Sequence, residues 1–225
     1  MKAFSLSVIA TAFAFAGTSA SALTIPTNAL VADSFQTFSQ EAMDGFDLTG
    51  VVVTPLGNAV AVPDVRGSFR LPITSITIDS SLHIAGGQAS GSALEIARVA
   101  PPRTPLAGQK VGVVLANFSI NYKTKQVLAD TTTLGGETVK QQPTFNFNVA
   151  TPLGIKYRFP LTITGNEVLD QLTLTPEARQ TQINALQLRA FEVGALDSIP
   201  SFGTLQQKIE VKFRKAVSTA PYVAQ

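Results

Sequence analysis

The chain has 225 residues, with 17 Lys or Arg, 15 Asp or Glu, and a formal net charge of +2 at pH 7. A charge this close to zero gives no electrostatic basis for binding nucleic acid. With no cysteine and one histidine, the chain offers neither a disulfide nor the set of His and Cys ligands that a zinc or copper site requires.

The first residues follow the order of a secretory signal peptide. Lys2 precedes an apolar run from Ala3 to Ala16, and the small residues Ala20-Ser21-Ala22 come after it. The pattern predicts a signal peptide over 1–22 with cleavage after Ala22. We therefore expect a periplasmic or secreted protein in which 23–225 form a single β-rich domain. No later apolar stretch reaches the length of a membrane helix, so no integral membrane segment is expected in the mature chain.

A short helix is expected over about 34–43. Phe35, Phe38 and Ala42 would lie along one side of it, and Gly45 would end it.

Period-two alternation dominates from about residue 46 onward. Ala116, Phe118, Ile120 and Tyr122 alternate with polar residues, which predicts a strand with these four on one face. The segment 155–163 alternates in the same way and is interpreted as one strand. Pro160 would place it at an edge or a bulge, because proline cannot donate to a ladder.

Glycine-containing pairs separate the alternating segments. Gly86-Gly87 and Gly165-Asn166 are interpreted as turns between strands. Strands with short turns at this spacing predict a mostly β fold, an antiparallel two-sheet sandwich or a barrel-like fold.

A second helix is expected over about 176–190. Thr175-Pro176-Glu177 has the order of an N-cap, a proline at the first helical position and an acid in the first turn. Ala178, Ile183 and the residues after them continue with approximately helical spacing.

Four segments together resemble a known family. They are Arg70-Leu71-Pro72-Ile73-Thr74, Ser81-Leu82-His83-Ile84-Ala85-Gly86-Gly87, Leu115-Ala116-Asn117-Phe118-Ser119-Ile120 and Leu172-Thr173-Leu174-Thr175-Pro176-Glu177-Ala178. Their order is similar to exported bacterial β-domains of the HtaA-like, haem-transport-associated kind and to related secreted proteins of unknown function. The resemblance implies a two-sheet β fold with short flanking helices. Such domains bind haem through a tyrosine and a histidine. The resemblance does not identify which tyrosine or histidine of this chain would correspond to them.

Candidate ligand-binding residues are His83, Tyr122 and Tyr157. His83 is the only histidine, and its alternation with Leu82 and Ile84 favours an exposed strand residue over a ligand. Tyr122 alternates with polar residues on its predicted strand, and Tyr157 lies on the apolar face of its own strand, where a pocket could form. No catalytic residues and no metal ligands are predicted.

Three functions follow from these patterns. The first is an exported, non-enzymatic β-domain that acts as a surface, matrix or binding module. The second is a carrier of a small molecule, with haem as the named alternative, although no cofactor is predicted. The third is a secreted hydrolase with a carboxylate-based site. The partner would be a small molecule or a cell-surface component, and the sequence sets no oligomeric state.

Overall fold

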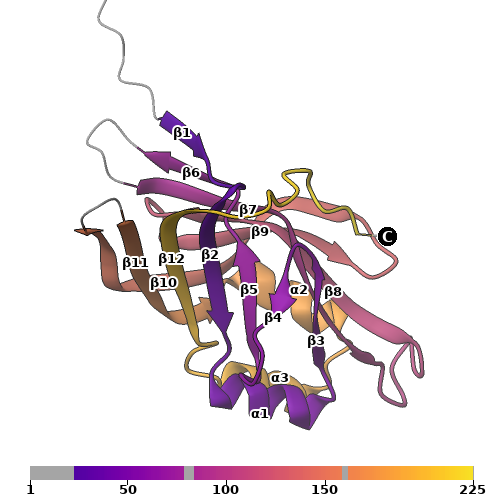
Figure 1. Cartoon of the computed structure of the whole chain (residues 1–225). Helices are drawn as coiled ribbons and strands as arrows, with labels where there is room; N and C mark the ends of the chain where they lie inside the picture. The colour runs from indigo at the N-terminus through magenta and orange to yellow at the C-terminus, as the bar shows by residue number, and fades with distance from the viewer. Residues whose placement is uncertain (1–22, 79–83, 159–161, 225) are drawn as a thin grey trace, which may run out of the picture.

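The computed structural model describes residues 23–78, 84–158 and 162–224 (Figure 1). The predicted signal peptide over 1–22 and His83 lie outside these ranges. The strands are β1 (Leu23–Pro26), β2 (Leu30–Thr37), β3 (Val52–Gly57), β4 (Val60–Ala61), β5 (Ser68–Pro72), β6 (Ser75–Ile78), β7 (Ile84–Val99), β8 (Lys110–Asn121), β9 (Gln126–Thr133), β10 (Thr138–Arg158), β11 (Thr162–Leu174) and β12 (Thr204–Phe213). The helices are α1 (Gln40–Thr49), α2 (Pro176–Ala185) and α3 (Ala190–Asp197).

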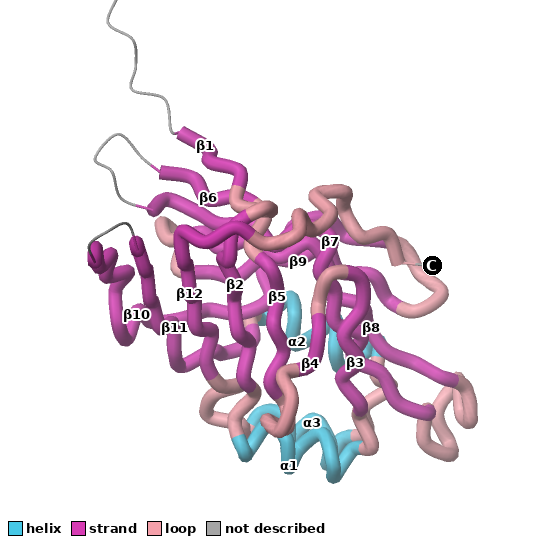
Figure 2. The backbone as a smooth tube through the Cα atoms, viewed as in Figure 1, coloured by secondary structure: helices cyan, strands magenta, loops and turns pink. Residues whose placement is uncertain are grey.

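The described strands form one antiparallel sheet that curls into a barrel-like shape. Their order is β1-β6-β7-β8-β9-β10-β11-β12-β2-β5-β4, with β3 paired to β7 (Figure 2). Of the two architectures expected from the sequence, the barrel-like one is therefore the one observed.

Two consecutive residues bring the ends of the sheet together. The Ile73 amide donates to Ala32 O on β2 at 2.8 Å, whereas the Thr74 amide donates to Gln88 O on β7 at 2.7 Å. The strand β5 thus pairs with β2, and its continuation β6 pairs with β7. This change of partner connects the two walls and encloses an interior lined by inward-facing side chains.

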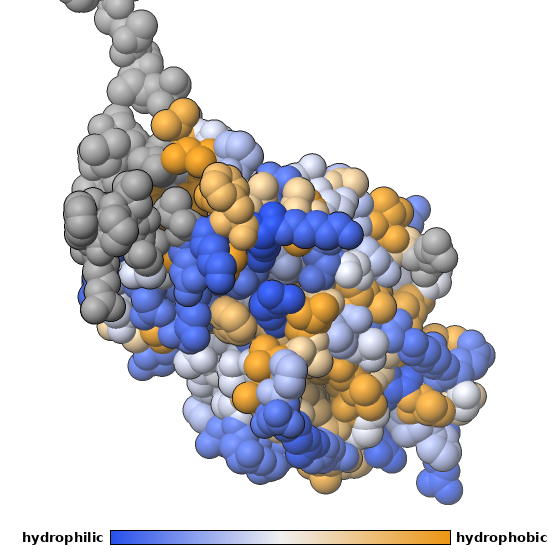
Figure 3. Space-filling view, in the orientation of Figure 1, coloured by the Kyte–Doolittle hydropathy of each residue, from blue (hydrophilic) through white to orange (hydrophobic). Residues whose placement is uncertain are grey.

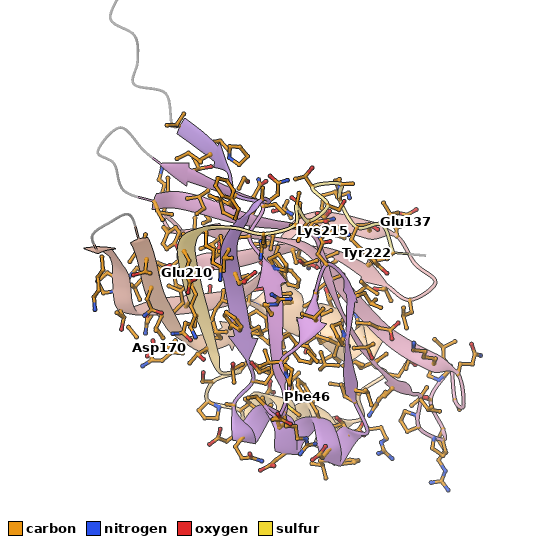
Figure 4. All side chains as sticks on the ribbon, viewed as in Figure 1. Phe46, Glu137, Asp170, Glu210, Lys215 and Tyr222 are labelled. Carbon is orange, nitrogen blue, oxygen red and sulfur yellow. The ribbon has the colours of Figure 1, made fainter. Side chains whose placement is uncertain are left out.

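Helices cover one end of the barrel. α1 and α3 lie side by side at the lower end in Figures 1 and 2, and Phe46 of α1, labelled in Figure 4, is buried in the main core. Phe38 packs edge-on against Phe46 and Phe69, with ring centroids 5.2 and 6.1 Å apart. The outer surface of α1 is largely hydrophilic (Figure 3). No helix in the described ranges is long and apolar enough to cross a membrane.

The first expected helix is wrong in position. Residues 34–37 belong to β2, and α1 begins at Gln40 behind the N-cap Ser39, whose hydroxyl accepts from the Ala42 amide. Pairing of β2 with both β5 and β12 overrides the weak helical spacing that predicted a helix there. Gly45 lies inside α1, close to Ile199, and the helix ends at Gly50 in the left-handed region.

The second expected helix begins as predicted but is shorter. Thr175 caps α2, and Pro176 is its first residue. The chain leaves the helix after Ala185, because Gln187 adopts a φ of 53°, and α3 follows from Ala190. This break lets Leu186 and Leu188 both pack against the core.

Two strand and turn interpretations are corrected. Residues 155–163 are not one strand: Arg158 of β10 pairs with Thr162 of β11, so the segment is the end of a hairpin. The two arms of the hairpin alternate in the same phase, so their residues resemble one continuous strand in the sequence. Conversely, Gly86-Gly87 and Gly165-Asn166 lie within the long strands β7 and β11. Gly86 and Gly165 allow close packing there, because an added Cβ would lie 3.1 Å from Ile120 O and 3.2 Å from Leu153 Cδ1.

Candidate ligand cavity

The interior of the barrel contains a cavity. Its volume is about 810 Å³, a figure that includes space open to solvent. Its apolar lining comes from every side of the barrel: Phe38, Leu71, Ile73, Ile76, Ile84, Ala89, Leu94, Ile96, Leu115, Phe118, Ile120, Val127, Phe145, Leu153, Leu205 and Ile209.

A bulge in β8 aims the next residues at this cavity. Asn117 has a φ of 53°, and the pairing of β8 with β7 and β9 shifts register around it. Before the bulge, Leu115 faces the main core and Ala116 faces a separate cluster on the other side of the sheet. After it, Phe118, Ile120 and Tyr122 line the cavity. The predicted common face is therefore correct for these three and wrong for Ala116, because the bulge changes the phase of alternation.

The Asn117 side chain also secures the C-terminal segment. Its Oδ1 accepts from the Tyr222 amide at 2.8 Å, and its Nδ2 donates to Tyr222 O at 2.9 Å (Tyr222 is labelled in Figure 4). The bulge is thus fixed from outside the barrel while it orients side chains within it.

Polar side chains form a row across three adjacent strands of the wall. Glu167 of β11 is the register partner of Gln207 on β12, which in turn is the partner of Ser34 on β2. Directly opposed residues share a face of the sheet. The Gln207 amide donates to Ser34 Oγ at 3.0 Å, and the Tyr122 hydroxyl donates to Glu167 Oε2 at 2.5 Å. Glu167 and Gln207 line the cavity together with Tyr122.

The environment shifts the pKa of both members of the Tyr122–Glu167 pair. Burial raises the pKa of the Glu167 carboxyl above its ordinary value, and the hydrogen bond from Tyr122 offsets part of this shift. Burial also raises the pKa of Tyr122, and the neighbouring Glu167 carboxylate adds to the effect. The Tyr122 hydroxyl therefore stays protonated at neutral pH and donates a hydrogen bond to Glu167.

Gln36 adds an unpaired amide to the same wall. It lies one row away from Gln207, as the register partner of Leu205, and is 6% exposed. Its Nε2 has no hydrogen-bond acceptor among the described residues, and the side chain lines the cavity. A buried donor without a partner costs free energy, so this position favours a ligand or water that accepts its hydrogen bond.

The structure places the three candidate residues differently. Tyr122 lines the cavity. The backbone of Tyr157 lies near the end of β10, paired with Ile163, and its side chain is outside the described part of the structure. His83 is also outside it.

The other polar residues of the cavity were missed by the sequence interpretation. Glu167 lies at an inward position, alternating with the fully buried Leu169. That phase would have revealed an acid facing the interior, but the supposed turn at Gly165-Asn166 concealed it. Gln36 was concealed by the helix expected over 34–43.

The described residues contain no group of three or more His, Cys, Asp or Glu side chains arranged to bind a metal ion.

Comparisons with known proteins add a single likeness of fold. No family model and no curated protein matches the chain. Among solved structures, the C-terminal domain of HtaA from Corynebacterium glutamicum is similar at 12% identity and a TM-score of 0.46, over 81% of this chain and 98% of that domain. The similarity agrees with the HtaA-like resemblance expected from the sequence, and identity this low gives no correspondence of residues or ligands.

Proposed function

We propose that this protein is a binding module that takes up one small, largely apolar molecule inside its barrel. The observation that carries the proposal is the cavity, which is lined mainly by aliphatic and aromatic side chains and by only a few polar ones. Ligand sites in proteins typically combine an apolar enclosure with a small number of polar groups that orient the ligand.

The polar groups gather on part of the wall. Tyr122, Glu167, Gln207 and Gln36 offer hydrogen bonds there, and apolar residues line most of the rest of the cavity. The expected ligand therefore has an apolar body and one polar end.

A glycine provides the means to fill the cavity. Gly87 lines it opposite Ile120, and a Cβ added there would meet no atom closer than Ser75 O at 3.9 Å. The Cβ of a leucine at this position would therefore meet no close contact, and the rest of its side chain would extend toward the cavity. Gly154 on β10 is the matched control, because it is exposed and an added Cβ would meet nothing within 4 Å.

The test is a fluorescence titration with N-phenyl-1-naphthylamine, a neutral apolar probe whose emission rises out of water. We expect saturable binding of one probe per chain, weakened by at least about tenfold, or 1.4 kcal/mol, in Gly87→Leu and unchanged in Gly154→Leu. A second filling variant, Ala89→Leu, guards against misfolding of the first. Absence of saturable binding, or equal binding by well-folded filling variants, would overturn the proposal.

Haem, the alternative ligand suggested by the resemblance, fits the described residues poorly. A tyrosine that ligates ferric haem does so as a tyrosinate. The Tyr122 hydroxyl instead donates a hydrogen bond to Glu167, and its pKa is raised, so it stays protonated. When haemin is titrated into the wild-type protein and into Tyr122→Phe, we therefore expect the same Soret spectrum for both. The export predicted from residues 1–22 stays a prediction.

A further inference from the structure

Four acidic side chains are buried in the described structure, and their partners differ. Asp33, Asp130, Glu167 and Glu192 are all less than 9% exposed. Three of them form ion pairs: Arg214 contacts Asp33 at 2.5 Å, Lys140 contacts Asp130 at 2.9 Å, and Arg98 and Arg189 each contact Glu192 at 2.9 Å. Glu167 has no cation within 4.0 Å among the described side chains.

The exception is also the acid that faces the cavity. One carboxylate oxygen of Glu167 accepts from Tyr122, and no described residue donates to the other. A buried carboxylate is stable only when it is paired or protonated. The fold supplies a cation for each of the other three acids, and beside Glu167 it supplies an open space.

We propose that the ligand itself brings this cation: the cavity takes an apolar molecule with a primary ammonium group, and the ammonium pairs with the Glu167 carboxylate. This inference rests on the proposed function and specifies its ligand class. The alkyl or aryl part of such a molecule occupies the apolar enclosure. Its ammonium has three N–H donors, one for the unoccupied oxygen of Glu167 and another for the side-chain carbonyl oxygen of Gln207 on the same wall.

The placement of Glu167 supports a ligand role over a structural one. A carboxylate that served only to join strands would bond to neighbouring strands, as Asp130 does with Asn117, Lys140 and Gln141. Glu167 makes its one hydrogen bond to a side chain that itself lines the cavity. Its pairing with a charged ligand occurs away from water, where the attraction between opposite charges is stronger than at the surface.

The test compares two probes that differ only in the polar end. n-Octylamine is cationic at pH 7 and n-octanol is neutral, and both are titrated by displacement of N-phenyl-1-naphthylamine. We expect the wild-type protein to bind n-octylamine at least about tenfold more tightly than n-octanol. In Glu167→Gln this preference should fall to about twofold or less, while N-phenyl-1-naphthylamine still binds.

Asp170→Asn is the matched control. Asp170 lies on the same strand, next to the inward-facing Leu169 and on the opposite face (Figure 4). Asp170→Asn removes the same charge as Glu167→Gln and should leave the preference for n-octylamine unchanged.

Two results would overturn the ammonium proposal. One is equal or tighter binding of n-octanol by the wild-type protein, and the other is an unchanged preference in Glu167→Gln. Failure of the proposed function is distinguishable, because it would show as no binding of N-phenyl-1-naphthylamine by any variant.

Discussion

Two buried glutamates, one at the helical end of the barrel and one in its cavity, are treated differently by the fold. Glu192 of α3 is 1% exposed and receives two hydrogen bonds from the Arg98 guanidinium, at 2.9 and 3.1 Å, and one from the Arg189 amide at 2.7 Å. Burial alone would raise the pKa of Glu192, but these hydrogen bonds, chiefly those from Arg98, outweigh it and lower the pKa to about 2. Glu167 is 4% exposed, has one hydroxyl donor, and its pKa is raised.

The difference indicates which site is complete. Arg98 also donates to the backbone oxygens of Leu186, Gln187 and Thr49, so this arginine joins the end of α1 and the segment after α2 to β7. Every donor and acceptor there is used within the protein. The cavity wall leaves interactions unused, as expected of a surface that meets another molecule.

The largest effect is expected from breaking the complete site. Arg98→Met leaves Glu192 buried without its main partner, and removing one member of a buried pair costs roughly 3–5 kcal/mol. We expect a loss of this size in the free energy of unfolding, measured by urea denaturation.

Arg179→Met is the control, because Arg179 pairs with Asp197 at the surface, where both side chains are well exposed. Such pairs contribute about 1 kcal/mol or less. If the two substitutions cost the same, the helical end does not depend on the buried pair.

A smaller effect is expected from acid. The folded pKa of Glu192, about 2, is below the value of roughly 4.3 for an unfolded glutamate. Its contribution to stability is therefore fully present above about pH 5 and is lost as the pH falls toward 2, by about 3 kcal/mol at most. Unfolding free energies measured between pH 2 and pH 6 should fall less steeply for Glu192→Gln than for the wild type. Parallel curves would contradict the assigned role of this carboxylate.

The local sequence predicted the parts of the fold that depend on neighbouring residues. Alternation identified the inward face of Phe118, Ile120 and Tyr122, and the capping pattern at Thr175-Pro176 located the start of α2. The bulge at Asn117 could not be predicted in this way, since it depends on contacts with Tyr222, which is 105 residues away.

The candidate site was harder to predict for a related reason. Its polar wall is built by register between β11, β12 and β2, and their paired residues Glu167, Gln207 and Ser34 are far apart in the chain. An acid at an inward position can be identified as a candidate ligand-binding group only when the opposing strands are known to supply no cation for it. The single histidine, which sequence reasoning weighed first, lies outside the described residues.

The most direct test of the account is the ionisation of Glu167 with and without a cationic ligand. The side-chain carboxyl carbons of ¹³C-labelled glutamates can be followed by NMR over pH, with Glu167→Gln assigning the signal. Without ligand, we expect Glu167 to titrate above the ordinary value of about 4.3. With n-octylamine bound, the midpoint should fall below the midpoint measured without ligand, because the ammonium stabilises the carboxylate. A midpoint that is the same in both states would contradict the claim that the ligand supplies the partner of Glu167.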